Sequence, residues 1–305
     1  MAIKLITDSK RLRKTAEKAI KIYGSGPEHN FHHYRNLQEH GKKNIFVSFG
    51  DDDGNCMGIL AQRDDKNVWY TVDEVLAPQE LRMPLFIEFI SFVFDSQKAK
   101  KLITESEHGF RLRLMKAEKN KFRFPKIMYS LFWPIIDLSE WDSSLQGGNW
   151  KKLRNLQHRL TKNHVVKTVD TLSIPKKQLT QLLDIWIKKR SFRDKVERER
   201  YINLIDGGFK GCDYARSIIV DGKVSTISAG WKIPNSNYAY SAIGILNYEF
   251  EGLGEYAYID ELNFLKSKGF EKANFGGSDE PMLQFKNKFK PVSQYQTDVY
   301  SILKS

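Results

Sequence analysis

The hydrophobic and polar positions along the chain predict helices and strands in an order that occurs twice. The first half predicts a helix over residues 8–23, strands over 45–49, 56–62 and 68–72, a helix over 79–96 and a short strand over 101–104. Its turns are Asp53-Gly54, a favoured hairpin dipeptide, and the polar run 64–67. These elements form a unit of three strands, a helix and a closing strand.

The second half repeats this order. Strands are expected over 217–220, 223–233 and 238–246, followed by a helix that ends at Gly269 and a closing strand over 271–275. Tyr258, Leu262 and Leu265 mark one face of that helix. Equivalent turns and closing strands lie about 170 residues apart, which favours duplication of one fold unit. Two unrelated α+β domains are the alternative.

A basic amphipathic helix is predicted between the units, over residues 149–163. Leu153, Leu156 and Leu160 recur at helical spacing. Its polar surface is basic and includes Lys151, Lys152, Arg154 and Arg159. That surface could bind RNA or phosphate, but the alternative is a solvated helix face, because no aromatic residues interleave with the basic ones. A further helix is expected over 175–190.

The chain length favours two domains. With 305 residues, it exceeds the usual size of a single core. The patterns place an N-terminal domain at residues 1–140, a basic helical linker at 141–170 and a C-terminal domain at 171–305, which is expected to carry the donor site.

Charge and cysteine usage narrow the partners and the compartment. The 49 Lys and Arg residues exceed the 37 Asp and Glu residues, giving a net charge of +12 that favours anionic partners such as RNA, anionic lipid or a phosphorylated cofactor. No apolar run reaches membrane-spanning length, and the N-terminal residues show no secretion signal. Cys56 and Cys212 are too few for a disulfide framework. A cytoplasmic protein is expected.

One turn in the second unit could bind an anion. Gly252 and Gly254 lie between the strand ending near Leu246 and the next helix, where backbone N–H groups and the helix N-terminus attract phosphate or carboxylate. A tight turn without a ligand would also need these glycines. The equivalent segment of the first unit, 73–84, has two prolines and no glycine, so its role is expected to be structural or to bind the other substrate.

Signatures of covalent catalysis and of metal binding are missing from the sequence. It contains no Gly-x-Ser-x-Gly elbow, no Walker lysine and no His-x-x-x-His helix. His29, His32 and His33 are interpreted as surface or substrate-contacting residues rather than metal ligands. Neither a metal nor a covalently bound cofactor is expected.

The remaining reactive side chains suit a reaction that depends on positioning. Asp279 and Glu280 are candidate acids or bases, Tyr240 lies on a strand, and Lys286 could stabilise an oxyanion. Amide-forming acyl transfer needs little more than these groups, because the nucleophile is the substrate's own amine.

Three segments carry a resemblance to a known family. The segments KGFEKANFGG (268–277), LQFKNKFKP (283–291) and WKKLRNLQHRL (150–160) resemble motifs of the Fem peptidoglycan-bridge aminoacyltransferases and of lysyl-phosphatidylglycerol synthase catalytic domains. The resemblance implies an α+β fold of two tandem GNAT-like domains, each a mixed, mainly antiparallel sheet flanked by helices.

The resemblance also implies roles for individual residues. In that family the Phe-Lys pair lies at the acyl-donor site, where the lysine balances charge on a phosphate or on the oxyanion, so Phe285 and Lys286 are the implied equivalents. Gly276 and Gly277 would end the closing strand beside the substrate, with Phe285 and Lys286 facing the cleft.

The resemblance leads to one expected activity and two alternatives. We expect amide-forming acyl or aminoacyl transfer to an amine, with aminoacyl-tRNA as donor and tRNA as partner. Glu249, at a position where GNAT turns usually have Gln or Arg, disfavours acyl-CoA by charge repulsion. The alternatives are an acyl-CoA-dependent N-acetyltransferase and a non-catalytic RNA-binding protein. The acceptor class, a small molecule, peptide or lipid with an amine or hydroxyl group, stays open.

Overall fold

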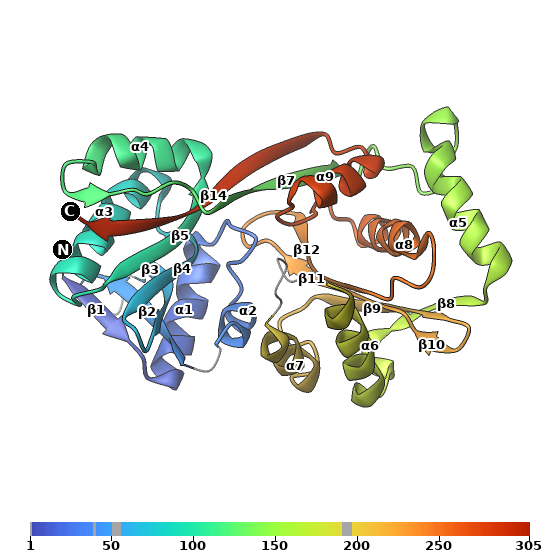
Figure 1. Cartoon of the computed structure of the whole chain (residues 1–305), viewed down its shortest axis with the longest axis horizontal. Helices are drawn as coiled ribbons and strands as arrows, with labels where there is room; N and C mark the ends of the chain where they lie inside the picture. The colour runs from blue at the N-terminus through green and yellow to red at the C-terminus, as the bar shows by residue number, and fades with distance from the viewer. Residues whose placement is uncertain (1, 39–40, 51–55, 191–196) are drawn as a thin grey trace.

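The computed structural model describes residues 2–38, 41–50, 56–190 and 197–305, which form one continuous mixed sheet with helices on both faces (Figure 1). The first half contains β1 (Ile3–Ile6), α1 (Ser9–Tyr23), α2 (Phe31–Asn36), β2 (Lys42–Phe49), β3 (Gly58–Asp64), β4 (Val68–Leu76), α3 (Gln79–Asp95), β5 (Lys101–Glu107), α4 (His108–Glu118), β6 (Phe122–Arg123) and β7 (Tyr129–Asp137). The expected hairpin turn at Asp53-Gly54 lies outside the described residues.

The second half begins with the predicted basic helix and ends with a long strand. Its elements are α5 (Lys151–Asn163), β8 (Val166–Asp170), α6 (Lys176–Lys189), α7 (Arg198–Asp206), β9 (Tyr214–Val220), β10 (Lys223–Val224), β11 (Thr226–Lys232), β12 (Tyr238–Leu246), α8 (Leu253–Ser267), β13 (Lys272–Asn274), α9 (Glu280–Lys286) and β14 (Ser293–Lys304). Short 3₁₀ turns precede α5 and α6 and follow α9. The repeated strand, helix and strand order expected from the sequence is confirmed.

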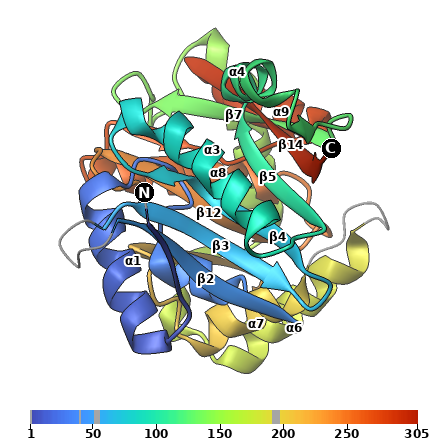
Figure 2. The same ribbon diagram turned by 90° about the vertical axis from the view of Figure 1, so that its left-hand side faces the viewer.

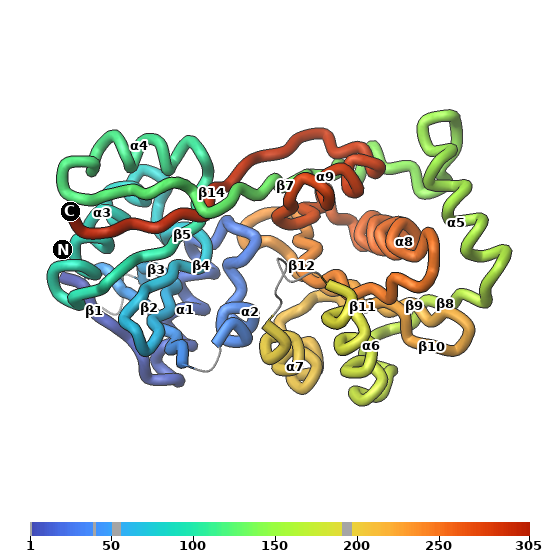
Figure 3. The backbone as a smooth tube through the Cα atoms, viewed as in Figure 1, coloured from blue at the N-terminus to red at the C-terminus, as the bar shows by residue number. Residues whose placement is uncertain are grey.

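Two strands join the halves of the sheet. The strand order is β1-β2-β3-β4-β5-β14-β7-β13-β12-β11-β9-β10, with β6 beside β14 and β8 beside β9. The C-terminal strand β14 therefore pairs with β5 of the first half, and β7 pairs with β13 of the second. Figure 3 shows β14 running back across the molecule to the first half. We call β1–β5 with α1–α4 the first unit, α5–α9 with β8–β13 the second unit, and β7 and β14 the shared strands.

Each unit contains one parallel strand pair that soon diverges. β4 and β5 are paired only from Val68–Tyr70 to Lys101–Ile103, and β12 and β13 only from Tyr238–Tyr240 to Lys272–Asn274. Beyond these positions the strands separate, which opens a gap at the carboxyl ends of each pair. The two gaps are equivalent places in the duplicated fold, and a ligand of either unit would enter there.

Helices cover both faces of the sheet and build the cores. In Figures 1 and 2, α3, α4 and α8 lie on one face, and α1, α2, α6 and α7 lie on the other. α1 shows how the sequence directs this packing: its N-cap Asp8 accepts a hydrogen bond from Arg11 N (2.9 Å), and Leu12, Ala16 and Ile20 form its buried stripe. No helix in the described parts is both long and apolar enough to span a bilayer.

Candidate active site

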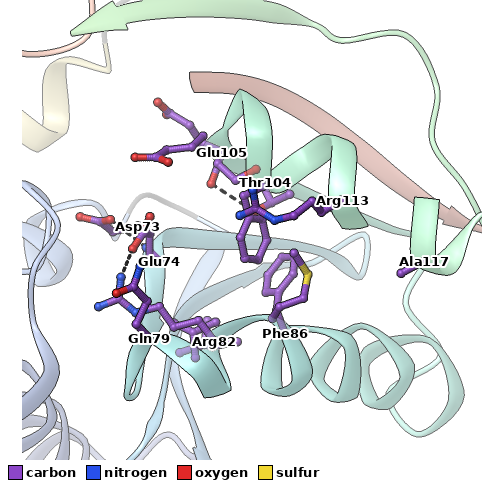
Figure 4. Close-up of a pocket in the computed structure, with 15 residues that line it drawn as sticks. Asp73, Glu74, Gln79, Arg82, Phe86, Thr104, Glu105, Arg113 and Ala117 are labelled. Atoms are coloured by element: carbon purple, nitrogen blue, oxygen red, sulfur yellow. Dashed lines mark hydrogen bonds and ion pairs between the residues drawn. The ribbon is translucent and has the colours of Figure 1, made fainter. Parts of the chain in front are cut away.

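A cavity lies in the gap between the diverging strands of the first unit. Its volume is about 490 Å³, and α3 and α4 form its other walls. Met83, Phe86 and Phe110 line an apolar side. Figure 4 shows Asp73, Glu74 and Glu105 gathered at the opposite side. This gap can therefore hold an apolar group beside a polar, reactive one.

A second cavity, of about 560 Å³, extends from the first toward the second unit. The two cavities share lining residues of β4, α3 and β5, and the second adds residues of the β11–β12 turn, β13 and β14. The shared residues are Asp73, Glu74, Gln79, Arg82, Glu105, Ser106 and Glu107. Together the cavities form one opening between the units, which we call the central cleft.

Carboxylates dominate the middle of the central cleft. Asp73 and Glu74 come from the end of β4, and Glu105 and Glu107 come from the end of β5, because parallel strands bring their carboxyl ends to the same edge. Arg82 forms an ion pair with Glu74. This ion pair does not compensate the charges of the other carboxylates in the cleft. In the described residues no three His, Cys, Asp or Glu side chains are arranged to hold a metal ion. The charge of the cleft suits a cationic amine.

Glu105 has the chemical properties of a general base. The pKa of its carboxyl is raised to about 7, and burial is the largest cause. The nearby Glu28 and Asp73 carboxylates contribute to the rise, whereas the donors of Thr297 and Trp133 oppose it. Such a group is partly ionised at neutral pH, so it can accept a proton from a substrate and later release it. Burial and the charge of Asp73 also raise the pKa of Glu74, whereas Arg82 lowers it.

The segment from Ser25 to Glu28 forms a rim of the cleft, and Asp73 holds it in place. Asp73 lies in a β-bulge with a φ of 62°. Its carboxylate accepts hydrogen bonds from Glu28 N (2.7 Å) and Glu74 N (2.8 Å). Gly26 approaches this carboxylate so closely that an added Cβ would lie 2.0 Å from Asp73 Oδ1. The rim therefore depends on a residue without a side chain at position 26.

We expect Gly26→Ala to displace the Asp73 carboxylate and to lower the free energy of unfolding by about 1–3 kcal/mol, the usual cost of overpacking. Chemical denaturation measures this change. Gly109→Ala is the matched control, because a Cβ at Gly109 in α4 would meet only Arg113 Nη1 at 3.5 Å. Equal stabilities of the two variants would contradict the close approach at Gly26.

Two of the three histidines of the N-terminal segment, His29 and His33, differ from the expectation of surface or substrate contacts, whereas His32 is half-exposed. The His29 side chain is buried; its Nδ1 accepts hydrogen bonds from Gly26 N (2.9 Å) and Ser25 N (3.1 Å), so Nε2 carries the hydrogen and donates to Glu74 O (3.0 Å). His33 is also buried, and its Nε2 lies 3.6 Å from Glu28 Oε1. His29 is thus a second support of the rim.

The equivalent gap in the second unit is filled by the chain itself. The rings of Tyr258, Phe275, Phe285 and Phe289 contact one another there, with centroids 4.8–5.8 Å apart. A Cβ added to Gly254 would lie 3.3 Å from Phe285 Cζ. Phe285 therefore packs against the glycine turn and occupies the space that an anion-bound ligand would need.

Lys286 is buried behind this aromatic cluster, with only 4% of its surface exposed. Its ammonium donates hydrogen bonds to the carbonyl oxygens of Phe275 and Gly276 (3.2 Å for the latter) and to Ser278 Oγ (2.9 Å). Burial lowers the pKa of Lys286 to about 8, against the charges of Glu261 and Asp279. This orientation differs from the expected cleft-facing one, because α9 turns the side chain toward the end of β13. Its catalytic role stays a prediction.

The other predicted acids and bases also have structural contacts. Asp279 is the N-cap of α9 and accepts a hydrogen bond from Met282 N (3.1 Å). Glu280 is exposed and accepts from Gln284 Nε2 (3.3 Å). Tyr240 is buried between Trp133 and Trp231, 6.0 and 5.2 Å from their ring centroids. None of these three lines either cavity of the central cleft.

The predicted glycines have steric roles. Gly276 has a φ of 78°, and a side chain on Gly277 would meet Leu131 at 2.9 Å and Trp133 at 3.2 Å. Gly252 has a φ of 81°, and its backbone lies against Leu156 of α5. These glycines allow close approach between elements of this chain, and their predicted ligand contacts stay untested.

The basic helix α5 lies at the end of the molecule away from the first unit (Figure 1). Lys151, Lys152, Arg154 and Arg159 are exposed. Arg154 donates to Leu145 O and Gly147 O, and Arg159 pairs with Glu251 at 2.5 Å. The structure therefore separates this surface from the central cleft. A nucleic acid contacting both would have to extend along the second unit.

The half-buried thiol of Cys212 does not suit nucleophilic catalysis. Burial and the charge of Asp213 raise its pKa to about 12, so it stays protonated at neutral pH.

The sequence interpretation allowed segment 73–84 a role in binding a substrate, but it named none of the individual residues of the central cleft. Asp73-Glu74 and Glu105-Ser106-Glu107 directly follow the apolar parts of β4 and β5. The sequence signal for this site was the acidic residues that follow two strands joined by a helix. The carboxyl ends of parallel strands lie at the same edge of a sheet, so these residues come near one another.

Comparisons with known proteins support the fold. Neither protein-family models nor curated protein sequences match the chain. The structure of L-PGS from Bacillus licheniformis has a TM-score of 0.66 at 15% identity and covers 98% of this chain and 92% of that one. FemX has a TM-score of 0.62 at 12% identity, covering 97% of each chain. A tandem GNAT protein from the clavulanic acid biosynthesis pathway has a TM-score of 0.57 at 9% identity, covering 99% and 98%.

At these identities the comparisons show the fold. The chain has the tandem GNAT architecture that the sequence resemblance implied, with an L-PGS-like and FemX-like arrangement over nearly its whole length.

Proposed function

We propose that the protein transfers an acyl or aminoacyl group to an amine acceptor in the central cleft, with Glu105 as general base. The observation that carries this proposal is the position of a carboxyl with a pKa of about 7 where two cavities meet, among further carboxylates. An amine enters as its ammonium ion, attracted by the negative charge of Asp73, Glu74 and Glu107. It must lose a proton before it can attack a carbonyl carbon.

The proposed reaction balances as follows. Glu105 accepts the proton of the amine, whose nitrogen forms a bond to the carbonyl carbon of the donor. After the attack the nitrogen carries one excess proton, which passes to the leaving oxygen or sulfur as the tetrahedral intermediate collapses to the amide. The donor therefore leaves as its alcohol or thiol, and Glu105 releases the first proton to solvent. Tyr295, which lines the cleft and whose hydroxyl accepts from Asn274 Nδ2 (3.1 Å), keeps its own O–H for a substrate oxygen.

The filled gap of the second unit favours aminoacyl-tRNA over acyl-CoA as donor. The glycine turn packs against Phe285 and Leu156, so the second unit offers no space for a pantetheine chain beside it. The first unit has the open gap but has Pro78 before α3 instead of a glycine turn. The net charge of +12 favours a polyanionic donor such as a tRNA.

A surrogate acceptor tests the reaction without knowledge of the natural one. Hydroxylamine is small enough to reach the cleft, and it converts an activated acyl group to a hydroxamate. We expect the protein to accelerate hydroxamate formation from tRNA charged with a mixture of radiolabelled amino acids, above the protein-free rate, and to leave acetyl-CoA unchanged. Acceleration with acetyl-CoA alone would establish the N-acetyltransferase alternative. Salt-dependent RNA binding without hydroxamate from either donor would favour the non-catalytic alternative.

A further inference from the structure

A chain of two hydrogen bonds ends on Glu105. Trp133 Nε1 donates to Thr297 Oγ1 at 2.8 Å, and Thr297 Oγ1 donates to Glu105 Oε1 at 2.5 Å. Trp133 and Thr297 are 5% and 7% exposed, so water has little access to either bond.

The strand register places these three side chains on one face of the sheet. Tyr295 is opposite Trp133 in the β14–β7 pair, and Val299 is opposite Glu105 in the β14–β5 pair. Thr297 lies two residues from each of these β14 positions. It is therefore the diagonal neighbour of both Trp133 and Glu105, at a separation that side chains of this length can bridge.

The direction of the hydrogen bonds is fixed by chemistry. An indole N–H can only donate, so the Thr297 oxygen must accept from Trp133. The hydroxyl hydrogen of Thr297 is then directed to Glu105 Oε1. Trp133 is itself held by stacking on Tyr295, with ring centroids 5.6 Å apart and an interplanar angle of 8°.

We propose that Thr297 is the positioning residue of Glu105, and that Trp133 sets the direction in which the Thr297 hydroxyl donates. The bond holds one carboxylate oxygen and leaves Oε2 for the substrate proton. It also stabilises the ionised form, so Thr297 lowers the pH at which Glu105 becomes a base. The role of Glu105 as general base rests on the proposed function, but its positioning by Thr297 does not.

The arrangement has a consequence for the duplicated fold. Glu105 belongs to the first unit, whereas Thr297 lies on the shared strand β14 at the end of the chain. The base is therefore completed only when the C-terminal strand is inserted between β5 and β7. The pairing of the shared strand β14 with β5, which joins the two units, therefore also completes the site.

Other charged and titratable groups around Glu105 define what the test must hold constant. Those that interact with it are Glu28 on the rim, Asp73 on β4, Tyr129 on β7, Tyr240 on β12 and Tyr295 on β14. Those that line the same cavity are Glu74 on β4, Arg82 on α3, Glu107 on β5 and Arg113 on α4. A substitution at Thr297 leaves all of these side chains in place.

The experiment compares Thr297→Val, which keeps the shape and removes the hydroxyl, with Thr297→Ser, which keeps the hydroxyl. The pKa of Glu105 is read by NMR titration of protein with ¹³C-labelled glutamate, its resonance assigned with Glu105→Gln. We expect Thr297→Val to raise the pKa of Glu105 by about one pH unit, the size of one lost hydrogen bond to a charged group. Thr297→Ser should titrate like the wild type.

Two further readouts make the outcome decisive. Trp133→Phe removes the indole N–H that donates to Thr297 and also lowers the pKa of Glu105, so it should raise this pKa too. It replaces Thr297→Val if that variant does not fold. An unchanged Glu105 pKa in the variant used, or a Thr297→Ser protein that behaves like Thr297→Val, would overturn the positioning role. If the pKa rises while the midpoint of the pH–rate profile with ethylamine stays constant, Thr297 positions Glu105 as inferred and the general-base role of Glu105 fails.

Discussion

Glu105→Gln lowers the rate of acyl transfer by about 10²–10⁴-fold, the usual contribution of a general base, while the protein stays folded. Glutamine keeps the size of the side chain, and its amide oxygen can still accept from Thr297. It cannot take a proton from the amine. The measurement is the single-turnover rate of amide formation with ethylamine, which is an ammonium ion at pH 7.5 and, unlike hydroxylamine, must lose a proton before it attacks. Far-ultraviolet circular dichroism confirms the fold.

Glu80→Gln is the matched control for this substitution. Glu80 is exposed in the first turn of α3, in the same unit but outside the lining of the central cleft. Its rate should equal that of the wild type. A Glu105→Gln protein that transfers at the wild-type rate would remove Glu105 from the mechanism and with it the carrying observation of the proposed function.

The same substitution should also raise stability, in one pH range only. The folded-state pKa of Glu105 is about 7 against an ordinary value of 4.5, so the folded protein holds this proton more tightly than the unfolded chain. The stability that the bound proton of Glu105 contributes is therefore fully present below pH 4.5 and is lost as pH rises through 7. The wild type should lose stability relative to Glu105→Gln between pH 5 and pH 8, as the difference in melting temperature between the two proteins at these pH values shows.

The local elements were predictable because their signals are local. The 238–246 strand matches β12, and the stripe of Leu179, Leu182 and Trp186 faces the core of the second unit as expected. Gly269 follows α8 with a φ of 80°, as a C-terminal glycine should. Repetition of these signals was enough to predict the duplicated fold.

The pairing of the shared strands β7 and β14 with strands of both halves was not predictable from these local signals. No strand was predicted from the sequence over β7 or β14. Hydrophobic alternation would in any case say which face of a strand is buried and not which strand is its neighbour. The pairing of Thr297 with the region of Glu105 joins residues almost two hundred positions apart. The site depends on that pairing, so the motif search, confined to contiguous segments, led to the second unit.

The glycine and Phe-Lys motifs predicted residues that lie close together in the structure, but they did not predict that the gap beside them is filled. The sequence brings Phe285, Lys286, Gly254 and Gly276 together, as expected for one site. Whether such a gap is open or filled depends on side-chain packing, and here four aromatic rings fill it. The first unit, which lacks the motif, has kept the open gap.

Lys286→Met should lower the free energy of unfolding by about 2–5 kcal/mol, because it leaves the carbonyls of Phe275 and Gly276 and the hydroxyl of Ser278 without their buried donor. Methionine replaces the aliphatic part of the side chain, so the loss reports the hydrogen bonds more than the volume. Urea denaturation followed by tryptophan fluorescence measures the change.

The rate of transfer separates this structural role from the catalytic role that the sequence resemblance implied. If Lys286 only stabilises the fold through its buried hydrogen bonds, the Lys286→Met protein should catalyse transfer at close to the wild-type rate at temperatures where it remains folded. Lys268→Met, at an exposed position after α8, is the control for loss of one positive charge. A folded Lys286→Met protein of wild-type stability without transfer activity would instead place the lysine in catalysis, and would require α9 to move so that its ammonium reaches a substrate.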